Sequence, residues 1–546
     1  MKRVIYLSIF ILSISYLLIF QEYGINLWDE GVLLNGSLRI MNGESVYRDF
    51  SGYPPGRYLV GATLFKIFGV NISVIRTAVT IMTSISVLML YSISLRLIPP
   101  QIPPHPPLLK GGLAFIPSIL FLVSPSVYYN RFYPIFTIFG IYVIYWYLDL
   151  QHIKTSLEKE TPTSPNHPFP PLFKGGLRGV KGGERGMVLA LSAIFAMFFK
   201  LEIGIGIMVI SAIVILLKKP PGVGRIKDFT YFSLTLILLI ICVTLYYAGS
   251  IDIYSLVSDI YFQVFKTYGL WGNPFPDIFS LGLWKRFNIH EIFTVILFYI
   301  PLIIYFLTFI ILLRTPNSEL RTLTAILLLF GIYVYNLVIW RTGFDNLMRC
   351  LPPAWILGCY LLYIFRMKLV KWTGEKIFSY ALILLLPLWF LYEMIFYGDF
   401  YTGSIGEMRK THNQLSMDRA YNIYADPVET VWINEITSYI KNNTSPDDTI
   451  FAIPLNPIWY FLTNRKNPTY YEWILPGELK TEVEQMEVIE QLKKKVPVFI
   501  IYANIAVDNR EERRFSNYAT FVYKFITDNY HMEKVVGLFQ IWRLGK

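Results

Sequence analysis

Two adjacent carboxylates, Asp29 and Glu30, follow the first apolar stretch of the chain closely, in the run Asn26-Leu27-Trp28-Asp29-Glu30-Gly31. A loop carboxylate can act as a general base that takes a proton from an attacking hydroxyl. Acids in loops are also commonly just solvated, so both interpretations stay open. We predict that Asp29 and Glu30 are catalytic and that Trp28, next to them, contacts a substrate.

A second chemical candidate is the pair Lys200 and Glu202, which lies between two apolar stretches in Phe198-Phe199-Lys200-Leu201-Glu202-Ile203-Gly204. A charge at membrane depth costs about 2.5–3.5 kcal/mol on insertion scales, so such residues usually have a function or a partner. Lys200 either binds an anion or forms an ion pair with Glu202 that only caps a helix end. We predict that Lys200 binds phosphate and that Glu202 contributes to substrate binding.

Four arginines are further candidates for phosphate binding, because the planar guanidinium group matches pairs of oxygen atoms. Arginines at helix ends also commonly extend to the membrane surface without any ligand, which is the alternative for each of them. Tyr53 precedes Arg57 in the run Tyr53-Pro54-Pro55-Gly56-Arg57. The Pro-Pro-Gly part of this run predicts a turn, and we predict that Tyr53 contacts a substrate. The four arginines are Arg57, Arg131, Arg341 and Arg349.

The elements that position these residues follow from composition. The chain has 546 residues, 54% hydrophobic and only 16% charged. This is too much apolar surface for one soluble core. The apolar residues form blocks of about twenty, the length that crosses about 30 Å of hydrocarbon as a helix, and not the shorter alternating segments of a barrel. We predict an α-helical polytopic membrane protein.

Several classes of site are disfavoured. The three cysteines lie in or beside apolar blocks and the six histidines are scattered. No disulfide framework, zinc site or histidine-ligated centre is therefore expected. The net charge of +11 is explained by lysines and arginines in the expected cytoplasmic loops, so nucleic acid is not an expected partner.

About eleven spans are expected, and residues 58–68, too short to cross, are predicted to form an amphipathic helix on the outer surface. The positive-inside pattern puts the N-terminus in the cytoplasm, together with Pro/Gly-rich insertions at 99–112 and 151–186, and puts the loop 21–71 outside. The two short spans flanking Lys200 form one broken or re-entrant unit in this interpretation. The expected spans are 4–20, 72–97, 113–128, 132–149, 187–199, 203–217, 229–248, 292–313, 322–340, 350–365 and 377–397.

The membrane part therefore covers residues 1–397, and residues 398–546 form a charged extracytoplasmic domain. Within it we predict helices at 428–442, 482–495 and 515–528, strands at 449–453 and 498–502, and a strand pair within 533–543. This pattern is typical of a small α/β domain. No Gly-rich phosphate fingerprint opens a helix, so no nucleotide site is expected.

In their order along the chain, these motifs resemble the GT-C superfamily of membrane glycosyltransferases, specifically bacterial relatives of protein O-mannosyltransferases and of the lipid A aminoarabinose transferase. The resemblance covers most of the membrane part. It consists of Asp29-Glu30 after the first span, the Pro-Pro turn and surface helix ending in Phe68-Gly69, Arg76 opening the second span, and Ser124-Pro125 on the next outer loop. Asn456-Pro457 and Asn464-Arg465-Lys466-Asn467-Pro468 match the soluble tail.

The resemblance implies an inverting transfer of a sugar from a polyprenyl-phosphate carrier to a glycan, lipid or protein acceptor on the outer face of the inner membrane. Asp29 would be the base, and cations would bind the leaving phosphate. Relatives often carry an acid shortly after the Ser-Pro turn, whereas this chain has Tyr128-Tyr129-Asn130-Arg131. We therefore expect no divalent metal and no other cofactor.

Two rival classes remain. A transporter or lipid flippase would share the helices, although such proteins usually carry charges near mid-membrane and two related halves. A non-enzymatic scaffold of a cell-envelope glycan pathway would use the outer domain to bind a partner. The sugar, the acceptor and the oligomeric state do not follow from the sequence.

Overall fold

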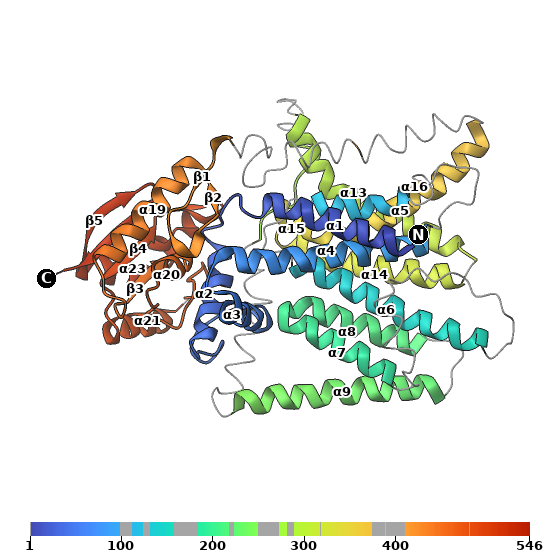
Figure 1. Cartoon of the computed structure of the whole chain (residues 1–546), viewed down its shortest axis with the longest axis horizontal. Helices are drawn as coiled ribbons and strands as arrows, with labels where there is room; N and C mark the ends of the chain where they lie inside the picture. The colour runs from blue at the N-terminus through green and yellow to red at the C-terminus, as the bar shows by residue number, and fades with distance from the viewer. Residues whose placement is uncertain are drawn as a thin grey trace.

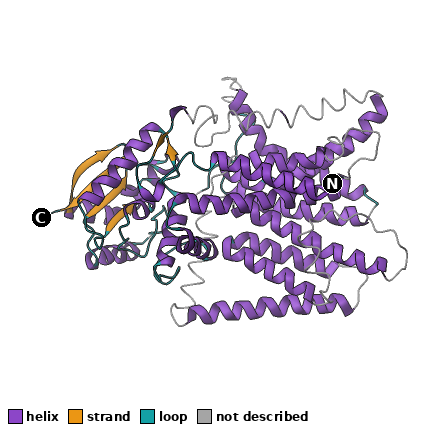
Figure 2. Cartoon of the chain, viewed as in Figure 1, coloured by secondary structure: helices purple, strands orange, loops and turns teal. Residues whose placement is uncertain are grey.

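The computed structural model describes residues 2–98, 112–123, 132–157, 184–217, 223–248, 272–280, 289–316, 318–373, 388, 410–479 and 481–545. A bundle of long helices is joined to a smaller domain that contains the described strands (Figures 1 and 2). The helices of the bundle are α1 (Lys2–Phe20), α4 (Ile72–Leu97), α5 (Gly112–Val123), α6 (Phe132–Leu157), α7 (Glu184–Phe199), α8 (Leu201–Leu217), α9 (Val223–Ala248), α13 (Ile289–Arg314), α14 (Ser318–Trp340), α15 (Phe344–Cys350) and α16 (Pro352–Thr373).

Five of these helices, α1, α4, α9, α13 and α14, are long and apolar enough to cross a membrane. Helices of this length and composition make the chain a multi-pass membrane protein. The pair α15 and α16 would add a sixth span, bent by 62° between the two helices. Nearly every expected span has a helix at its position in the described residues. The expected span 377–397 lies outside them, so a total of eleven remains a prediction.

Helices α7 and α8 form a tight hairpin with Lys200 at its tip, and Figure 1 shows them side by side. The close packing depends on Gly204, where a Cβ atom would lie 2.6 Å from the carbonyl oxygen of Ala193. The start of α7 and the end of α8 therefore lie at the same end of the bundle, opposite Lys200. The hairpin puts Lys200 at a turn and not at the middle of a span, and one broken or re-entrant unit stays a prediction.

Two short helices, α2 (Asp29–Met41) and α3 (Gly56–Phe68), lie between the bundle and the soluble domain (Figure 1). They pack closely because Gly36 leaves room for the ring of Tyr58: a Cβ at Gly36 would lie 2.5 Å from that ring. The sequence predicted α3, whose exposed face carries Leu59, Ile67 and Phe68, as an interfacial helix requires. It did not predict α2.

The soluble domain contains a four-stranded sheet in the order β3-β4-β6-β5, with β3 parallel to β4 and the other pairs antiparallel. Alternate residues of β3 and β4 face opposite sides, so the sheet is packed on both faces. Ile450 and Phe499 share a core with α19, whereas Phe451 and Ile500 share one with α21 and α23. Bounds are β1 (Asn413–Gln414), β2 (Tyr424–Ala425), α19 (Pro427–Asn442), β3 (Ile450–Ile453), α20 (Ile458–Thr463), α21 (Glu482–Lys494), β4 (Phe499–Ala503), α22 (Phe515–Tyr518), α23 (Thr520–Asn529), β5 (Tyr530–Val536) and β6 (Phe539–Leu544).

The soluble domain is docked closely on α2 and α3, the two helices that we call the outer layer. The backbone of Tyr424 exchanges two hydrogen bonds of 2.7 Å with Gly24 and Glu22 just after α1. Helix α2 approaches α20 so closely that a Cβ at Gly31 would lie 2.4 Å from the amide nitrogen of Ile458. The predicted α/β domain is confirmed, and it forms one continuous core with α2 and α3.

Candidate active site

Lys200 stands at the tip of the α7–α8 hairpin, where its ammonium nitrogen lies 2.7 Å from Oε1 of Glu202. The same ammonium group lies 5.5 Å from the centre of the Tyr53 ring and 5.9 Å from that of Tyr133. A cation over an aromatic ring at such a distance is attracted to the face of that ring. Both members of the ion pair are largely buried. The ion pair allowed by the sequence therefore exists, and it is part of a larger cluster.

Arg57, in the first turn of α3, reaches the same place from the outer layer. One of its Nη2 hydrogens is donated to the carbonyl oxygen of Phe199 at 2.8 Å, directly before Lys200. Its guanidinium group lies 4.6 Å from the centre of the Tyr53 ring and 5.6 Å from that of Phe132. The residue is 5% exposed, and its Nε is buried without a hydrogen-bond acceptor.

The charges of this cluster do not balance among the described residues. Lys200 and Arg57 are both cationic, whereas Glu202 is the one carboxylate that contacts them. Burying an unpaired charge is costly, and an anionic ligand with several oxygen atoms would relieve both the charge and the unsatisfied N–H of Arg57. The cluster is therefore suited to bind a phosphate group.

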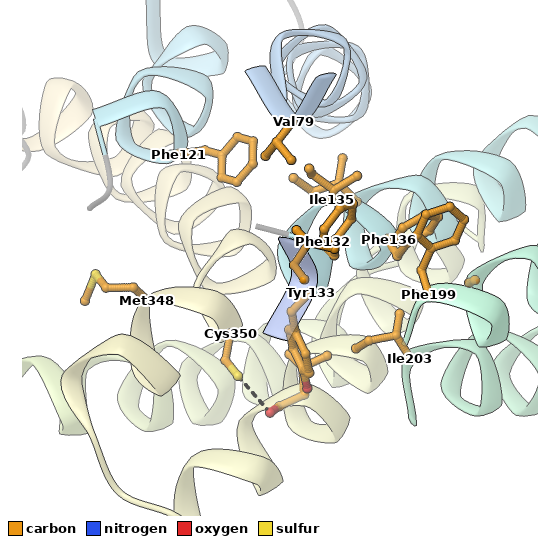
Figure 3. Close-up of a cluster of buried hydrophobic side chains, with 14 of the residues drawn as sticks. Val79, Phe121, Phe132, Tyr133, Ile135, Phe136, Phe199, Ile203, Met348 and Cys350 are labelled. Atoms are coloured by element: carbon orange, nitrogen blue, oxygen red, sulfur yellow. Dashed lines mark hydrogen bonds between the residues drawn. The ribbon is translucent and has the colours of Figure 1, made fainter. Parts of the chain in front are cut away.

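An aromatic wall lies behind the hairpin tip. Figure 3 shows Phe132 and Phe136 of α6 together with Phe199, and the rings of Phe136 and Phe199 stack at 4.6 Å. The Cys350 thiol, at the end of α15, donates a hydrogen bond of 3.0 Å to the carbonyl oxygen of Val334, and Tyr133 of α6 lies beside Cys350 (Figure 3). This wall keeps water away from one side of the cations, which strengthens their attraction for an anion.

The contacts seen for the remaining predicted arginines are to other parts of the structure. Arg349 pairs with Asp345 within α15. The backbone carbonyl of Arg341 accepts a hydrogen bond of 3.0 Å from the Asn346 side chain. Arg131 lies outside the described residues. Phosphate binding by these three stays a prediction.

Asp29 is the first residue of α2, and Asn26 caps this helix. The side-chain oxygen of Asn26 accepts hydrogen bonds from the amides of Trp28 at 3.0 Å and Asp29 at 2.7 Å, as a side chain that caps a helix start does. The Asp29 carboxylate therefore lies at the N-terminal end of a helix, where the aligned peptide dipoles give a positive potential. Trp28 packs against Phe539 of the soluble domain, with 6.1 Å between ring centres, so packing accounts for its position.

Glu30 has a partner of its own. Both of its carboxylate oxygens accept hydrogen bonds of 2.7 Å from Arg76 in α4. Arg76 also donates to the backbone oxygens of Gln21 and Gly24, at 2.7 and 2.8 Å. Glu30 is thus engaged in a buried ion pair that anchors the start of α2, and its catalytic role stays a prediction.

The structure brings together four of the ten predicted site residues, Tyr53, Arg57, Lys200 and Glu202, from two segments of the chain. Asp29 lies in the neighbouring helix α2, which packs against α3. The sequence analysis missed the site's link to the soluble domain. Trp473 packs against Tyr53 at 5.2 Å between ring centres, and its indole N–H is donated to Glu478 at 2.7 Å.

Glu472, the neighbour of Trp473, connects the soluble domain to α2. Its buried carboxylate pairs with Arg39 and accepts a hydrogen bond of 2.7 Å from Asn35, both on α2.

Among the described residues, no group of three His, Cys, Asp or Glu side chains gathers in metal-binding geometry.

We expect the protein to lose thermal stability as the pH rises from about 4.5 to about 8, because the unfolded state releases the Glu478 proton near the ordinary carboxyl pKa and the folded state releases it only near pH 8. Burial raises the pKa of Glu478 to about 8, so the folded state keeps a proton that the unfolded state releases, and stability falls as the pH rises. For a partly exposed side chain we expect a loss of about 2 kcal/mol over this range. Melting curves in detergent should show a smaller pH dependence for Glu478→Gln than for wild type.

Exposed Glu487 on α21 provides the matched control, since Glu487→Gln removes a carboxylate from the same domain surface. Its melting temperature should follow pH as wild type does. Equal pH slopes for wild type and Glu478→Gln would show that this carboxyl group is not the titrating one.

No family model matches the chain, and no curated protein matches it. Among solved structures, it aligns over 91% of its length with the Archaeoglobus fulgidus oligosaccharyltransferase in its apo form, covering 69% of that chain at 10% identity and a TM-score of 0.46. It aligns over 99% of its length with ArnT from Cupriavidus metallidurans bound to undecaprenyl phosphate, covering 97% of that chain at 10% identity and a TM-score of 0.48.

A third alignment, with the arabinofuranosyltransferase AftD from Mycobacteria, uses the whole of this chain but only 40% of that protein, at 12% identity and a TM-score of 0.49. Because the identities are 10–12% and the TM-scores are below 0.5, the functional argument rests on the site itself.

Proposed function

We propose that this protein transfers a sugar from a polyprenyl-phosphate carrier to an acceptor at the outer surface of the membrane. The observation that carries the proposal is the buried cluster of Lys200, Arg57 and Glu202, which in the described part of the chain holds two cations and one carboxylate beside an unsatisfied guanidinium N–H. A lipid phosphate is an anion that reaches such a place from within the bilayer. The positive-inside pattern supports the outer side.

In this mechanism Lys200 and Arg57 bind the phosphate of the donor. As the bond between the anomeric carbon and the phosphate oxygen breaks, negative charge grows on that oxygen, and the two cations stabilise it. The leaving phosphate is already a stable anion, so no acid is needed to protonate it, unlike in a glycosidase.

The acceptor hydroxyl supplies the new bond. Its oxygen attacks the anomeric carbon from the side opposite the phosphate, and its proton passes to the Asp29 carboxylate, so the configuration inverts. The reaction needs no metal in this proposal. The helix end at Asp29 and the exclusion of water by the aromatic wall support these roles.

Lys200→Ala should weaken the binding of undecaprenyl phosphate to the purified full-length protein by about ten- to a hundredfold, since a hydrogen bond to a charged group contributes about 1.5–3 kcal/mol. The equilibrium Kd of the bare lipid phosphate in detergent is the measurement. Arg57→Gln should act in the same direction.

Lys66→Ala is the matched control, because Lys66 is an exposed lysine of the same outer layer, on the face of α3 that points away from the cluster. It should bind undecaprenyl phosphate as wild type does. An unchanged Kd for Lys200→Ala, or an equal loss for Lys66→Ala, would contradict the assignment of this cluster as the phosphate site.

A further inference from the structure

Tyr53 has neighbours from two domains. On the membrane side its ring lies near the cations of Arg57 and Lys200, at 4.6 and 5.5 Å. From the soluble domain, the ring of Trp473 lies 5.2 Å away, with an angle of 33° between the ring planes. Tyr53 is thus the one described side chain that contacts both cations and the soluble domain.

Hydrogen bonds between their two segments hold the rings of Tyr53 and Trp473 next to each other. The amide of Ser51 donates a hydrogen bond of 2.8 Å to the carbonyl oxygen of Tyr470. The amide of Glu472 donates one of 3.1 Å to the Ser51 hydroxyl. These contacts align residues 470–473 with residues 51–53, so that Trp473 falls opposite Tyr53.

The indole of Trp473 is also held within its own domain. Its N–H is donated to Oε1 of Glu478, whose other oxygen accepts the amide hydrogen of Leu475 at 2.8 Å. The hydroxyl of Tyr518 is donated to the carbonyl oxygen of Ile474 at 2.6 Å, which fixes the backbone next to the indole. Trp473 is 5% exposed, so it has little freedom to move.

We propose that Trp473 is a positioning residue of the phosphate site, which fixes the ring of Tyr53 and, through that ring, the cations of Arg57 and Lys200. This inference rests on the proposed function. It makes the soluble domain a part of the donor site, because this domain supplies the support on which Tyr53 rests.

The test is the Kd of undecaprenyl phosphate for the full-length protein. Trp473→Ala should raise the Kd about three- to tenfold, the range expected for the loss of one aromatic pair. Trp473→Phe keeps a ring against Tyr53 and should stay within about twofold of wild type. Trp542→Ala, a partly buried tryptophan of β6 in the same domain, is the control for general damage and should leave the Kd unchanged.

A double-mutant cycle separates positioning from a structural effect. If Trp473 acts through Tyr53, Trp473→Ala should add no further loss in a Tyr53→Leu background. Full additivity of the two changes, no effect of Trp473→Ala, or no rescue by Trp473→Phe would overturn the inference.

The failures of the two proposals can be told apart. If Lys200→Ala weakens binding and Trp473→Ala does not, the phosphate site stands and the role of Trp473 is wrong. If neither variant changes the Kd, the proposed phosphate site itself is wrong.

Discussion

Asp29→Asn should lower the rate of sugar transfer by about 10²–10⁴-fold, the contribution of a positioned general base. Asparagine has nearly the same shape as aspartate but cannot accept a proton from the acceptor. The backbone amide of residue 29 can still donate to Asn26, so α2 should keep its cap. Expression, membrane insertion and affinity for undecaprenyl phosphate should therefore remain at wild-type levels.

The measurement is glycan analysis of membranes from cells that carry the wild-type protein, a deletion or the Asp29→Asn variant. A sugar that disappears equally in the deletion and the variant would identify the transferred sugar. Asp447→Asn, at an exposed position of the soluble domain, is the matched control and should restore the sugar. Transfer in membranes should also persist in EDTA if no metal takes part.

Other outcomes would reject the mechanism. Near-normal transfer by Asp29→Asn would show that Asp29 is not the base. A glycan change in the deletion but not in the variant would favour a flippase or a scaffold, since neither needs a proton acceptor at this position.

The membrane part was predictable from the sequence because hydrophobic block length is set by the bilayer and needs no knowledge of tertiary contacts. The span expected at 72–97 is the helix α4, Ile72–Leu97, and the two short spans expected on either side of Lys200 are the helices α7 and α8. Helix α2 was missed for the opposite reason. Its residues Gly31, Asn35 and Gly36 are poor helix formers, and they are there to fit against Ile458, Glu472 and Tyr58.

Some site residues could likewise be predicted from the sequence, whereas others depend on tertiary contacts. Lys200, Glu202, Arg57 and Tyr53 were recognisable because a charge between apolar stretches, or an arginine beside an outer turn, stands out locally. Trp473 did not stand out, since its role depends on a contact with Tyr53, which is far away in the sequence. The pairing of Glu30 with Arg76 did not stand out either, because nothing in the sequence shows that Arg76 binds both oxygens of Glu30.

Arg76→Met should lower the stability of the protein by about 3–5 kcal/mol, the cost of removing one partner of a buried ion pair. Arg76 is 2% exposed and Glu30 4% exposed, so the carboxylate left behind would be buried without its counter-charge. Two backbone carbonyl oxygens, those of Gln21 and Gly24, would lose their donor as well. The melting temperature of the full-length protein in detergent is the measurement.

The double variant Glu30→Met with Arg76→Met distinguishes an uncompensated charge from lost packing. A well-packed apolar pair often replaces a buried ion pair at little cost, so the double variant should recover more than half of the loss in melting temperature. The part it does not recover would reflect the two carbonyl oxygens. A double variant that melts below Arg76→Met would show that the pair matters through its hydrogen bonds and shape, and that the charge of Glu30 is tolerated without Arg76. Since this pair anchors the turn that carries Asp29, Arg76→Met should also slow sugar transfer while leaving the Kd of undecaprenyl phosphate near its wild-type value.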